Sequence, residues 1–327
     1  MNIKEPSNTH PYLTLPTESA TVVEIPASES LIQAWTSPIN DVQNPEELQE
    51  RLIQIGDAFN ALIKYGQDKV KNELKSGPFD VVTEMDKGIE SLFRQWLKQH
   101  YPHHKVVGEE WPNDTFGPDD VVWYLDPIDG TSNFVTNHPD VAVHLGCIYQ
   151  GKPFATYIGQ PFLEKNYACN INSSERLPLN LPETLTIGTE YFPNRVHEHE
   201  NFTNIIEHLN ANTHARKSIG RHIIDLIEGN VTAFYKQRVK PWDIIAPLEV
   251  LAVLQQDEWN IDLYIPDPDN PEDYLRVNPF TNDPKAVEYF NLKLTQNSRY
   301  GHILVTPKSL PDLHEYLEEQ ILLNNDI

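Results

Sequence analysis

The spacing of apolar residues changes between residues 100 and 121, and this change restricts the possible folds more than any other feature. From residue 46 to residue 100, apolar side chains recur every three or four positions, which is typical of amphipathic helices. From residue 121 onward, the runs VVWYLD and DVAVHLGCIYQ are β-branched or aromatic, and in the second the apolar residues alternate, which is typical of strands. The chain therefore combines helices with sheets.

Two helices are expected before this change. The first runs from Glu46 to about Lys75, where a Gly-Pro pair would stop it. Its apolar face is formed by Leu48, Leu52, Ile55, Phe59 and Leu62. The second helix follows Asp86 and ends near Tyr101.

The later elements indicate two different halves. After VAVHLGCIYQ, a turn at Gly151 leads into the strand FATYIGQ, which predicts a hairpin or meander of antiparallel sheet. The second half mixes strands with helices, namely LTIGTEY, 196–210, 221–228, VTAFYK, 242–254, GHILVTP and LPDLHEYLEEQILL. We therefore predict an irregular extension over 1–45, an α+β half over 46–180 and an α/β half over 181–327.

Composition excludes several classes of protein. The chain has 327 residues, 25 Lys and Arg against 48 Asp and Glu, and 39% hydrophobic residues, which is typical of an acidic globular protein. Such a charge repels nucleic acid and anionic membranes, so neither is an expected partner. The sequence has no stretch of eighteen apolar residues and no secretory signal. Its two cysteines, Cys147 and Cys169, favour a reducing compartment, and we expect a cytoplasmic protein.

Four acidic stretches lie at the ends of predicted elements: DVVTEMD (80–86), GEEW (108–111), DPIDGTSNF (126–134) and PWD (241–243). In the third, a strand delivers Asp126 at its carboxyl end and Gly130 permits a tight turn, so Asp126 and Asp129 can converge. Alone, such a motif is typical of a turn, a solvated loop or a helix cap. Their joint presence in this order favours one common site.

Converged carboxylates repel one another unless a cation neutralises them. Mg²⁺ prefers hard oxygen ligands and usually binds through a few carboxylates together with substrate phosphate. Zinc is a poor candidate, because the sequence has no paired cysteines and no HExxH spacing. The glycine and hydroxyl residues after Asp129 would also leave backbone amides available for an anion.

The strings DVVTEMD, GEE, WYLDPIDGTSNF and PWDIIA together resemble the signatures of the inositol monophosphatase family, from about residue 46 to the end. This resemblance implies a layered αβαβα sandwich of the inositol monophosphatase and fructose bisphosphatase type, and a homodimer. It also implies a lithium-sensitive, Mg²⁺-dependent phosphatase acting on a small phosphorylated metabolite, with two or three ions per site.

The resemblance assigns metal ligands residue by residue. Glu109, Asp126 and the backbone carbonyl of Ile128 would hold one ion, and Asp126, Asp129 and Asp243 a second. A third, looser ion would contact Glu109. Water attack would then need no covalent enzyme intermediate.

The resemblance also assigns groups around the metals. Thr131, with Glu109 and Asp86 nearby, would orient and deprotonate the attacking water. The amides of Gly130 and Thr131 would hold the phosphate, and Lys75 would lie at the mouth of the site.

Two positions depart from the family pattern. Lys236 replaces a glutamate that binds substrate hydroxyls in inositol-specific members, and Arg221 replaces a small hydroxyl residue after Gly220. The loop after the last motif also lacks the usual double glycine. A basic wall formed by Lys236 and Arg221 would favour a substrate with a second negative group, although a solvated strand end explains the basic stretch equally well.

Several functions therefore remain open. The substrate could resemble inositol monophosphate, or it could be more anionic, as are histidinol phosphate, fructose bisphosphate and phosphoadenosine phosphate. The protein could also bind an anion without turning it over, or hold ions for structural reasons alone.

Overall fold

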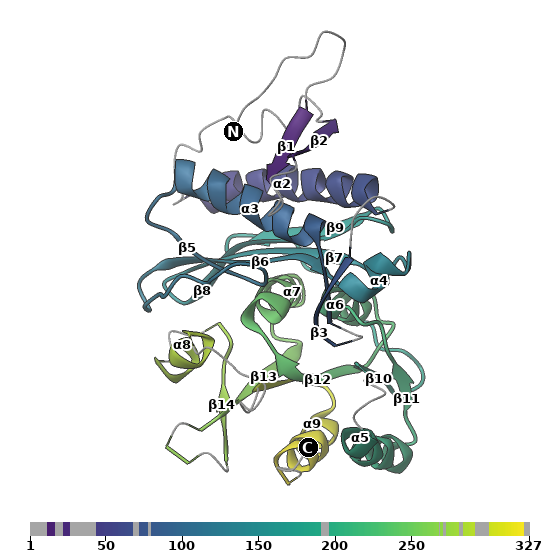
Figure 1. The fold of residues 1–327 in the computed structure, drawn as a ribbon. Coiled ribbons are helices and arrows are strands. Elements are labelled where there is room, and N and C mark those ends of the chain that lie inside the picture. Colours follow the sequence, from purple (N-terminus) through teal and green to yellow (C-terminus); the bar gives the residue numbers. More distant parts are fainter. Residues whose placement is uncertain are drawn as a thin grey trace.

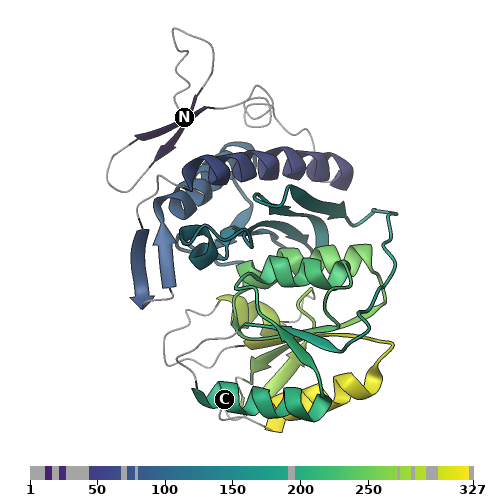
Figure 2. The ribbon, with the colours of Figure 1, turned by 90° about the vertical axis from the view of Figure 1, so that its right-hand side faces the viewer.

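The computed structural model describes residues 12–16, 22–26, 44–67, 72–77, 80–190, 196–267, 269–270, 273–280, 284–291 and 301–323. Its elements stack as helix, sheet, helix, sheet and helix layers (Figure 1). A quarter turn about the vertical axis shows the same order (Figure 2). The predicted mixed class and αβαβα sandwich are thus confirmed.

Helices α2 (Pro45–Gly66) and α3 (Glu84–His100) form the first outer layer. Asn44 caps α2 by accepting a 3.1 Å hydrogen bond from the amide of Glu47, and the predicted apolar face is buried. The prediction that this helix extends to Lys75 is wrong. The buried stripe ends at Ile63, and the mostly polar residues after Gly66 offer no apolar face to support further turns.

Two pairs of short strands contact α3 through β1 (Tyr12–Pro16) and β4 (Asp80–Thr83). β3 (Asn72–Gly77) begins where the helix was expected to continue, and it pairs antiparallel with β4. β1 (Tyr12–Pro16) and β2 (Val22–Pro26) also pair antiparallel, so the prediction of an irregular extension is wrong for these two segments. The remaining residues before Asn44 lie outside the described ranges.

The first sheet has the strand order β5-β6-β7-β8-β9. Its strands are β5 (Lys105–Gly108), β6 (Val121–Asp129), β7 (Ala142–Tyr149), β8 (Lys152–Gln160) and β9 (Lys165–Asn170). β6 to β9 are antiparallel neighbours, which confirms the predicted meander, whereas β5 joins β6 in parallel. A five-residue helix, α4 (Thr131–Val135), follows β6.

The middle layer consists of α6 (Ile219–Ile227) and α7 (Pro241–Leu254). α7 is apolar nearly all round and packs against β6, β7 and β8. α6 packs against β7 on one side and β12 on the other. One continuous hydrophobic core therefore joins this layer to both sheets.

The second sheet has the order β11-β10-β12-β15-β13-β14. Its strands are β10 (Thr186–Thr189), β11 (Asn212–His214), β12 (Ala233–Val239), β13 (Trp259–Pro266), β14 (Tyr274–Val277) and β15 (Gly301–Pro307). Helices α5 (Val196–Leu209) and α9 (Pro311–Leu323) form the last layer, and α8 (Pro284–Asn291) lies near β14 (Figure 1). None of the described helices is both long and apolar enough to cross a bilayer.

Candidate functional site

Two parallel strands deliver the first acidic groups. β5 and β6 pair so that Gly108 lies opposite Leu125. Glu109 follows Gly108 and Asp126 follows Leu125, so both carboxylates leave the same edge of the sheet. β6 then passes through an irregularity in its pairing with β7 before it reaches Asp129.

Asp126 lies among other acidic groups. It is 2% exposed, and its Oδ1 accepts a 3.0 Å hydrogen bond from the amide of Ile128. Burial raises the pKa of Asp126 well above its usual range, and the charges of four neighbouring carboxylates raise it further, namely Glu109, Asp129, Asp243 and Asp86. The structure therefore brings together the acidic residues that the sequence places in four separate stretches.

Two helix starts contribute to this group. Asp86 lies in the first turn of α3 and is fully buried, and Asp243 lies in the first turn of α7. Burial raises the pKa of Asp243, Lys236 lowers it and Glu109 raises it further, and the net value is about 7. We call Asp86, Glu109, Asp126 and Asp243 the acidic cluster.

Asp129 has a different environment. Its Oδ2 accepts 2.7 Å hydrogen bonds from the Ser218 hydroxyl and the Gly220 amide, and its Oδ1 accepts one of 3.0 Å from the Ile219 amide. Nε2 of His144 lies 3.2 Å from Oδ2. Burial raises the pKa of Asp129, but His144 and these hydrogen bonds together bring it below its usual value. Asp129 thus ties the end of β6 to the N-terminus of α6.

The chemistry of the acidic cluster fits Mg²⁺. Carboxylate oxygens and the Ile128 carbonyl are hard ligands, and both cysteines are free and buried. A divalent cation would also offset the mutual repulsion that raises the pKa of Asp126. As the side chains stand, however, the described part of the chain has no group of three His, Cys, Asp or Glu that could hold a metal ion. The cluster is a set of candidate ligands, and Asp129 is engaged by α6.

The turn after Asp129 requires glycine. Gly130 has a φ of +87°, and a Cβ there would lie 2.8 Å from the Asp140 carbonyl oxygen and 3.1 Å from that of Lys217. The Thr131 hydroxyl donates a 3.0 Å hydrogen bond to the Ile128 carbonyl. The predicted water-orienting group and the predicted carbonyl ligand therefore contact each other directly.

Arg221, a predicted substrate contact, lies beside carboxylates of its own chain. Its Nη2 lies 2.9 Å from Asp225 Oδ1, and its Nε lies 3.6 Å from Asp140 Oδ1. Arg216 bonds the same two carboxylates, at 2.8 Å to Asp225 and 3.1 Å to Asp140. We call these four residues the ion-pair network. It holds Arg221 in place by charges of its own chain.

Lys236 is also paired within the chain. Its Nζ lies 2.9 Å from Oε2 of Glu190, and both side chains are nearly buried. Burial lowers the pKa of Lys236, but Glu190 and then Asp243 raise it to a net value above normal. Carboxylates of the chain thus face both Lys236 and Arg221, and contact of either residue with a substrate stays a prediction. The side chain of Lys75, in β3, lies outside the described side chains, so its position stays a prediction.

Sequence analysis did not single out His144 or Ser218. Alternation along β7 places His144 on the opposite sheet face from Val143 and Leu145, and this pattern could have indicated a polar group facing the site. Ser218 is the N-cap of α6. A serine just before a predicted helix was a usable signal for an N-cap.

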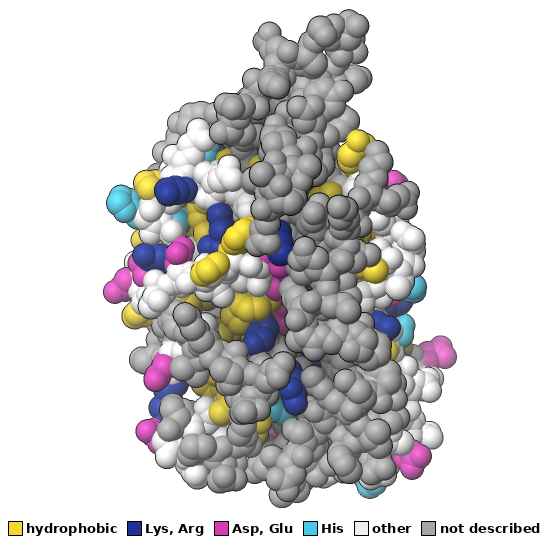
Figure 3. Space-filling view, viewed as in Figure 1, with side chains coloured by type: hydrophobic (Ala, Val, Ile, Leu, Met, Phe, Trp, Pro, Cys, Tyr) yellow, Lys and Arg dark blue, Asp and Glu magenta, His cyan; other side chains and the backbone are white. Residues whose placement is uncertain are grey.

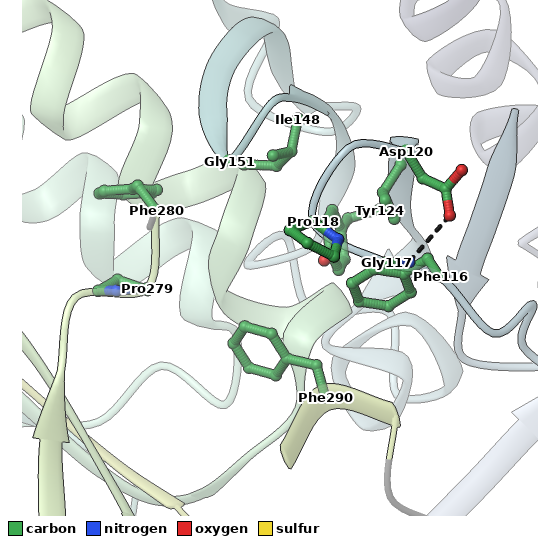
Figure 4. Close-up of a pocket in the computed structure, with 11 residues that line it drawn as sticks. Phe116, Gly117, Pro118, Asp120, Tyr124, Ile148, Gly151, Pro279, Phe280 and Phe290 are labelled. Carbon is green, nitrogen blue, oxygen red and sulfur yellow. Dashed lines mark hydrogen bonds between the residues drawn. The ribbon is translucent and has the colours of Figure 1, made fainter. Parts of the chain in front are cut away.

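A separate hollow lies between the first sheet and the segment leading into α8 (Figure 4). Its walls are mostly apolar and include four aromatic residues, Phe116, Tyr124, Phe280 and Phe290. Asp120, its one acidic lining residue, accepts a 2.8 Å hydrogen bond from the Gly117 amide. No member of the acidic cluster lines this hollow.

The order of the layers is the fold of the inositol monophosphatases and SuhB proteins. The chain superposes on the extragenic suppressor protein SuhB of Bartonella henselae with a TM-score of 0.61 and 16% identity, covering 82% of this chain and 97% of that chain. An IMPase/NADP phosphatase complexed with Mg²⁺ and phosphate gives a TM-score of 0.58 and 21% identity, covering 78% of this chain and 98% of that chain.

Sequence comparison agrees with the fold. Residues 44–252 match the inositol monophosphatase family, and the chain belongs to this family. Inositol monophosphatase 2 of Solanum lycopersicum is 35% identical over 124 residues, which is 37% of this chain and 47% of that protein. The fructose-1,6-bisphosphatase/inositol-1-monophosphatase of Aquifex aeolicus is 28% identical over 199 residues, or 57% and 75%. The chain thus spans about half the length of the tomato relative.

Proposed function

We propose that this protein is a Mg²⁺-dependent phosphomonoesterase that hydrolyses the monophosphate of a small, neutral alcohol. The observation that carries the proposal is the convergence of the acidic cluster on Asp126, whose pKa is raised by burial and by its acidic neighbours. Membership of the inositol monophosphatase family and the likeness to a protein complexed with Mg²⁺ and phosphate support the same activity.

Within this proposal, Asp126, Glu109, Asp243 and the Ile128 carbonyl hold Mg²⁺, joined by Asp129 if it shares the oxygens that now face α6. When bound, Mg²⁺ would activate water and neutralise charge on the phosphate. The number of ions, two or three, is part of the proposal.

The remaining roles belong to the chain's own polar groups. Asp86 and Glu109 accept the proton of the attacking water, and the Thr131 hydroxyl orients that water while it stays bonded to Ile128. The amides of Gly130 and Thr131 donate to the phosphate oxygens.

The preference for a neutral alcohol rests on charge. Glu190 pairs with Lys236, and Asp225 and Asp140 face Arg221, so a second negative group of a substrate would compete with carboxylates of the chain for both cations. Fructose bisphosphate and phosphoadenosine phosphate, which carry a second phosphate, are therefore expected to react more slowly than inositol monophosphate and histidinol phosphate, which carry one.

The proposal is tested by measuring phosphate release from these four compounds and from p-nitrophenyl phosphate, with and without Mg²⁺. Release that requires Mg²⁺ and is fastest for inositol monophosphate would support it. Binding of a phosphorylated metabolite without turnover at any metal concentration would contradict it and favour an anion-binding protein.

We also propose a cytoplasmic homodimer, for which light scattering would measure the mass of the assembly.

A further inference from the structure

Glu90 lies one helical turn after Asp86 on α3 and is fully buried. Its Oε2 accepts a 2.8 Å hydrogen bond from the amide of Glu110, and its Oε1 accepts one of 3.3 Å from the amide of Trp111. Arg94, one further turn along, donates from Nε to Oε1 at 2.8 Å. Burial raises the pKa of Glu90, while Arg94 and the two amides lower it without cancelling that effect. The carboxylate thus holds two consecutive amides of the loop after β5.

The same carboxylate also lies against Gly108, the residue that precedes Glu109. A Cβ at Gly108 would lie 2.5 Å from Oε1 of Glu90 and 2.7 Å from its Oε2, so only glycine permits this approach. Glu109 is therefore flanked by a residue in contact with Glu90 and by another that donates to it. This arrangement restricts the backbone of Glu109 from both directions.

Further hydrogen bonds fasten the loop to α3. The indole Nε1 of Trp111 donates to the Lys87 carbonyl at 3.2 Å. Asn113 Oδ1 accepts from the Gly108 amide at 2.7 Å and from Arg94 Nη2 at 3.4 Å. One helix thus carries Asp86 itself and also fixes the loop that carries Glu109.

We propose that Glu90 is a positioning residue, which sets the Glu109 carboxylate relative to Asp86 and Asp126 by gripping the backbone on both sides of Glu109. This inference rests on the proposed function, because Glu109 matters through the cation it would hold. Substituting a residue that holds a metal ligand in place typically lowers metal affinity or activity by about 10-fold to 100-fold. A merely structural anchor would instead affect folding and leave metal binding unchanged.

The test substitutes Glu90→Gln, which keeps the size of the side chain but removes its charge and one acceptor oxygen. Mg²⁺ affinity is measured by calorimetry, kcat and KM with p-nitrophenyl phosphate, and backbone exposure by hydrogen exchange. We expect about 10-fold to 100-fold weaker Mg²⁺ binding, a lower kcat, an unchanged KM and faster exchange at Glu110 and Trp111.

A matched control is Asp262→Asn on the second sheet. Asp262 is also a nearly buried carboxylate bonded to an arginine, with 2.7 Å between its Oδ1 and Nε of Arg276. We expect this variant to lose thermal stability without a change in Mg²⁺ affinity. If Glu90→Gln behaves in the same way, with Mg²⁺ affinity within about twofold of the wild type, the positioning role is overturned.

Failure of the proposed function gives a different pattern. If the wild type neither binds Mg²⁺ nor releases phosphate, that function fails, and hydrogen exchange alone decides on the loop. Faster exchange at Glu110 and Trp111 in Glu90→Gln, but not in Asp262→Asn, then supports the positioning of the backbone, whereas equal exchange overturns it.

Should Glu90→Gln not fold, Asn113→Ala removes the second anchor, and the same loss of Mg²⁺ affinity is expected.

Discussion

The acidic cluster and the ion-pair network are two groups of buried charge separated by the turn at Gly130, and they are built in opposite ways. In the network, Arg216 and Arg221 face Asp140 and Asp225 at distances from 2.8 to 3.6 Å. The cluster consists of carboxylates alone, and its members raise the pKa of Asp126.

The difference separates structural from functional charge. A buried charge is tolerated when it is paired, and the network supplies its own counter-charges. In the cluster, Lys236 offsets part of the charge on Asp243, and under the proposed function a cation from solution would offset the remainder. Replacing a carboxylate should therefore have opposite effects on stability in the two regions.

The largest effect is expected for Asp126→Asn. Removing the central carboxylate should lower phosphatase activity at least about 1,000-fold, equivalent to about 4 kcal/mol of transition-state stabilisation. The variant should unfold at a higher temperature than the wild type in EDTA, because one repelling charge is gone. Phosphate release and thermal unfolding measure the two effects, and full activity would refute the assignment of Asp126 as a ligand.

The converse substitution is Asp225→Ala in the ion-pair network. It leaves Arg216 and Arg221 to share Asp140 as the one remaining carboxylate of the network, and it should reduce the free energy of unfolding by about 3 kcal/mol. Denaturant titration measures the change. Lys64→Ala is the control, since the exposed pair of Lys64 with Glu164 should contribute less than about 1 kcal/mol. Similar losses in both variants would contradict the comparison.

Gly130→Ala tests the turn between the two regions. The new Cβ would meet the Asp140 carbonyl oxygen at 2.8 Å in a left-handed backbone conformation, so stability should fall by about 2 kcal/mol. Because the turn also carries Asp126 and Asp129, Mg²⁺ affinity should fall with it. Unfolding and calorimetry together check this, and a loss of stability alone would place the turn outside the site.

The smallest effect expected is the pH dependence of the metal-free protein. The pKa of Asp243 is raised to about 7, so its contribution to stability is fully present below the unfolded-state pKa and is lost as pH rises through 7. From about pH 6 to about pH 7.5 this loss should be on the order of 1 kcal/mol. Denaturation in EDTA would measure it against Asp243→Asn, in which the slope should be smaller. Identical slopes would refute the prediction.

Sequence patterns predicted much of the fold because the relevant signals are local. The apolar stripe of α2, the alternation in β7 and the turn at Gly151 each depend on residues close in sequence, and each predicted element formed. The end of α2 was misplaced because the strand pairing of β3 with β4, which competes with the helix, carries only a weak local signal.

The candidate site was predictable in part. The acidic motifs lie at element ends, so their convergence followed from the family pattern and from strand topology. The engagement of Asp129 by Ser218 and the pairing of Lys236 with Glu190 were missed, because these contacts join residues 89 and 46 positions apart. Charge patterns along a sequence do not reveal which buried ions neutralise each other in space.

The middle helices share one core with both sheets, and their first turns carry Asp243 and the groups that hold Asp129. Any substitution that swells or shrinks that core shifts both helix starts at once. Under the proposed function, Mg²⁺ affinity would therefore respond to packing defects far from the acidic cluster, and it would report on the spacing between the two sheets.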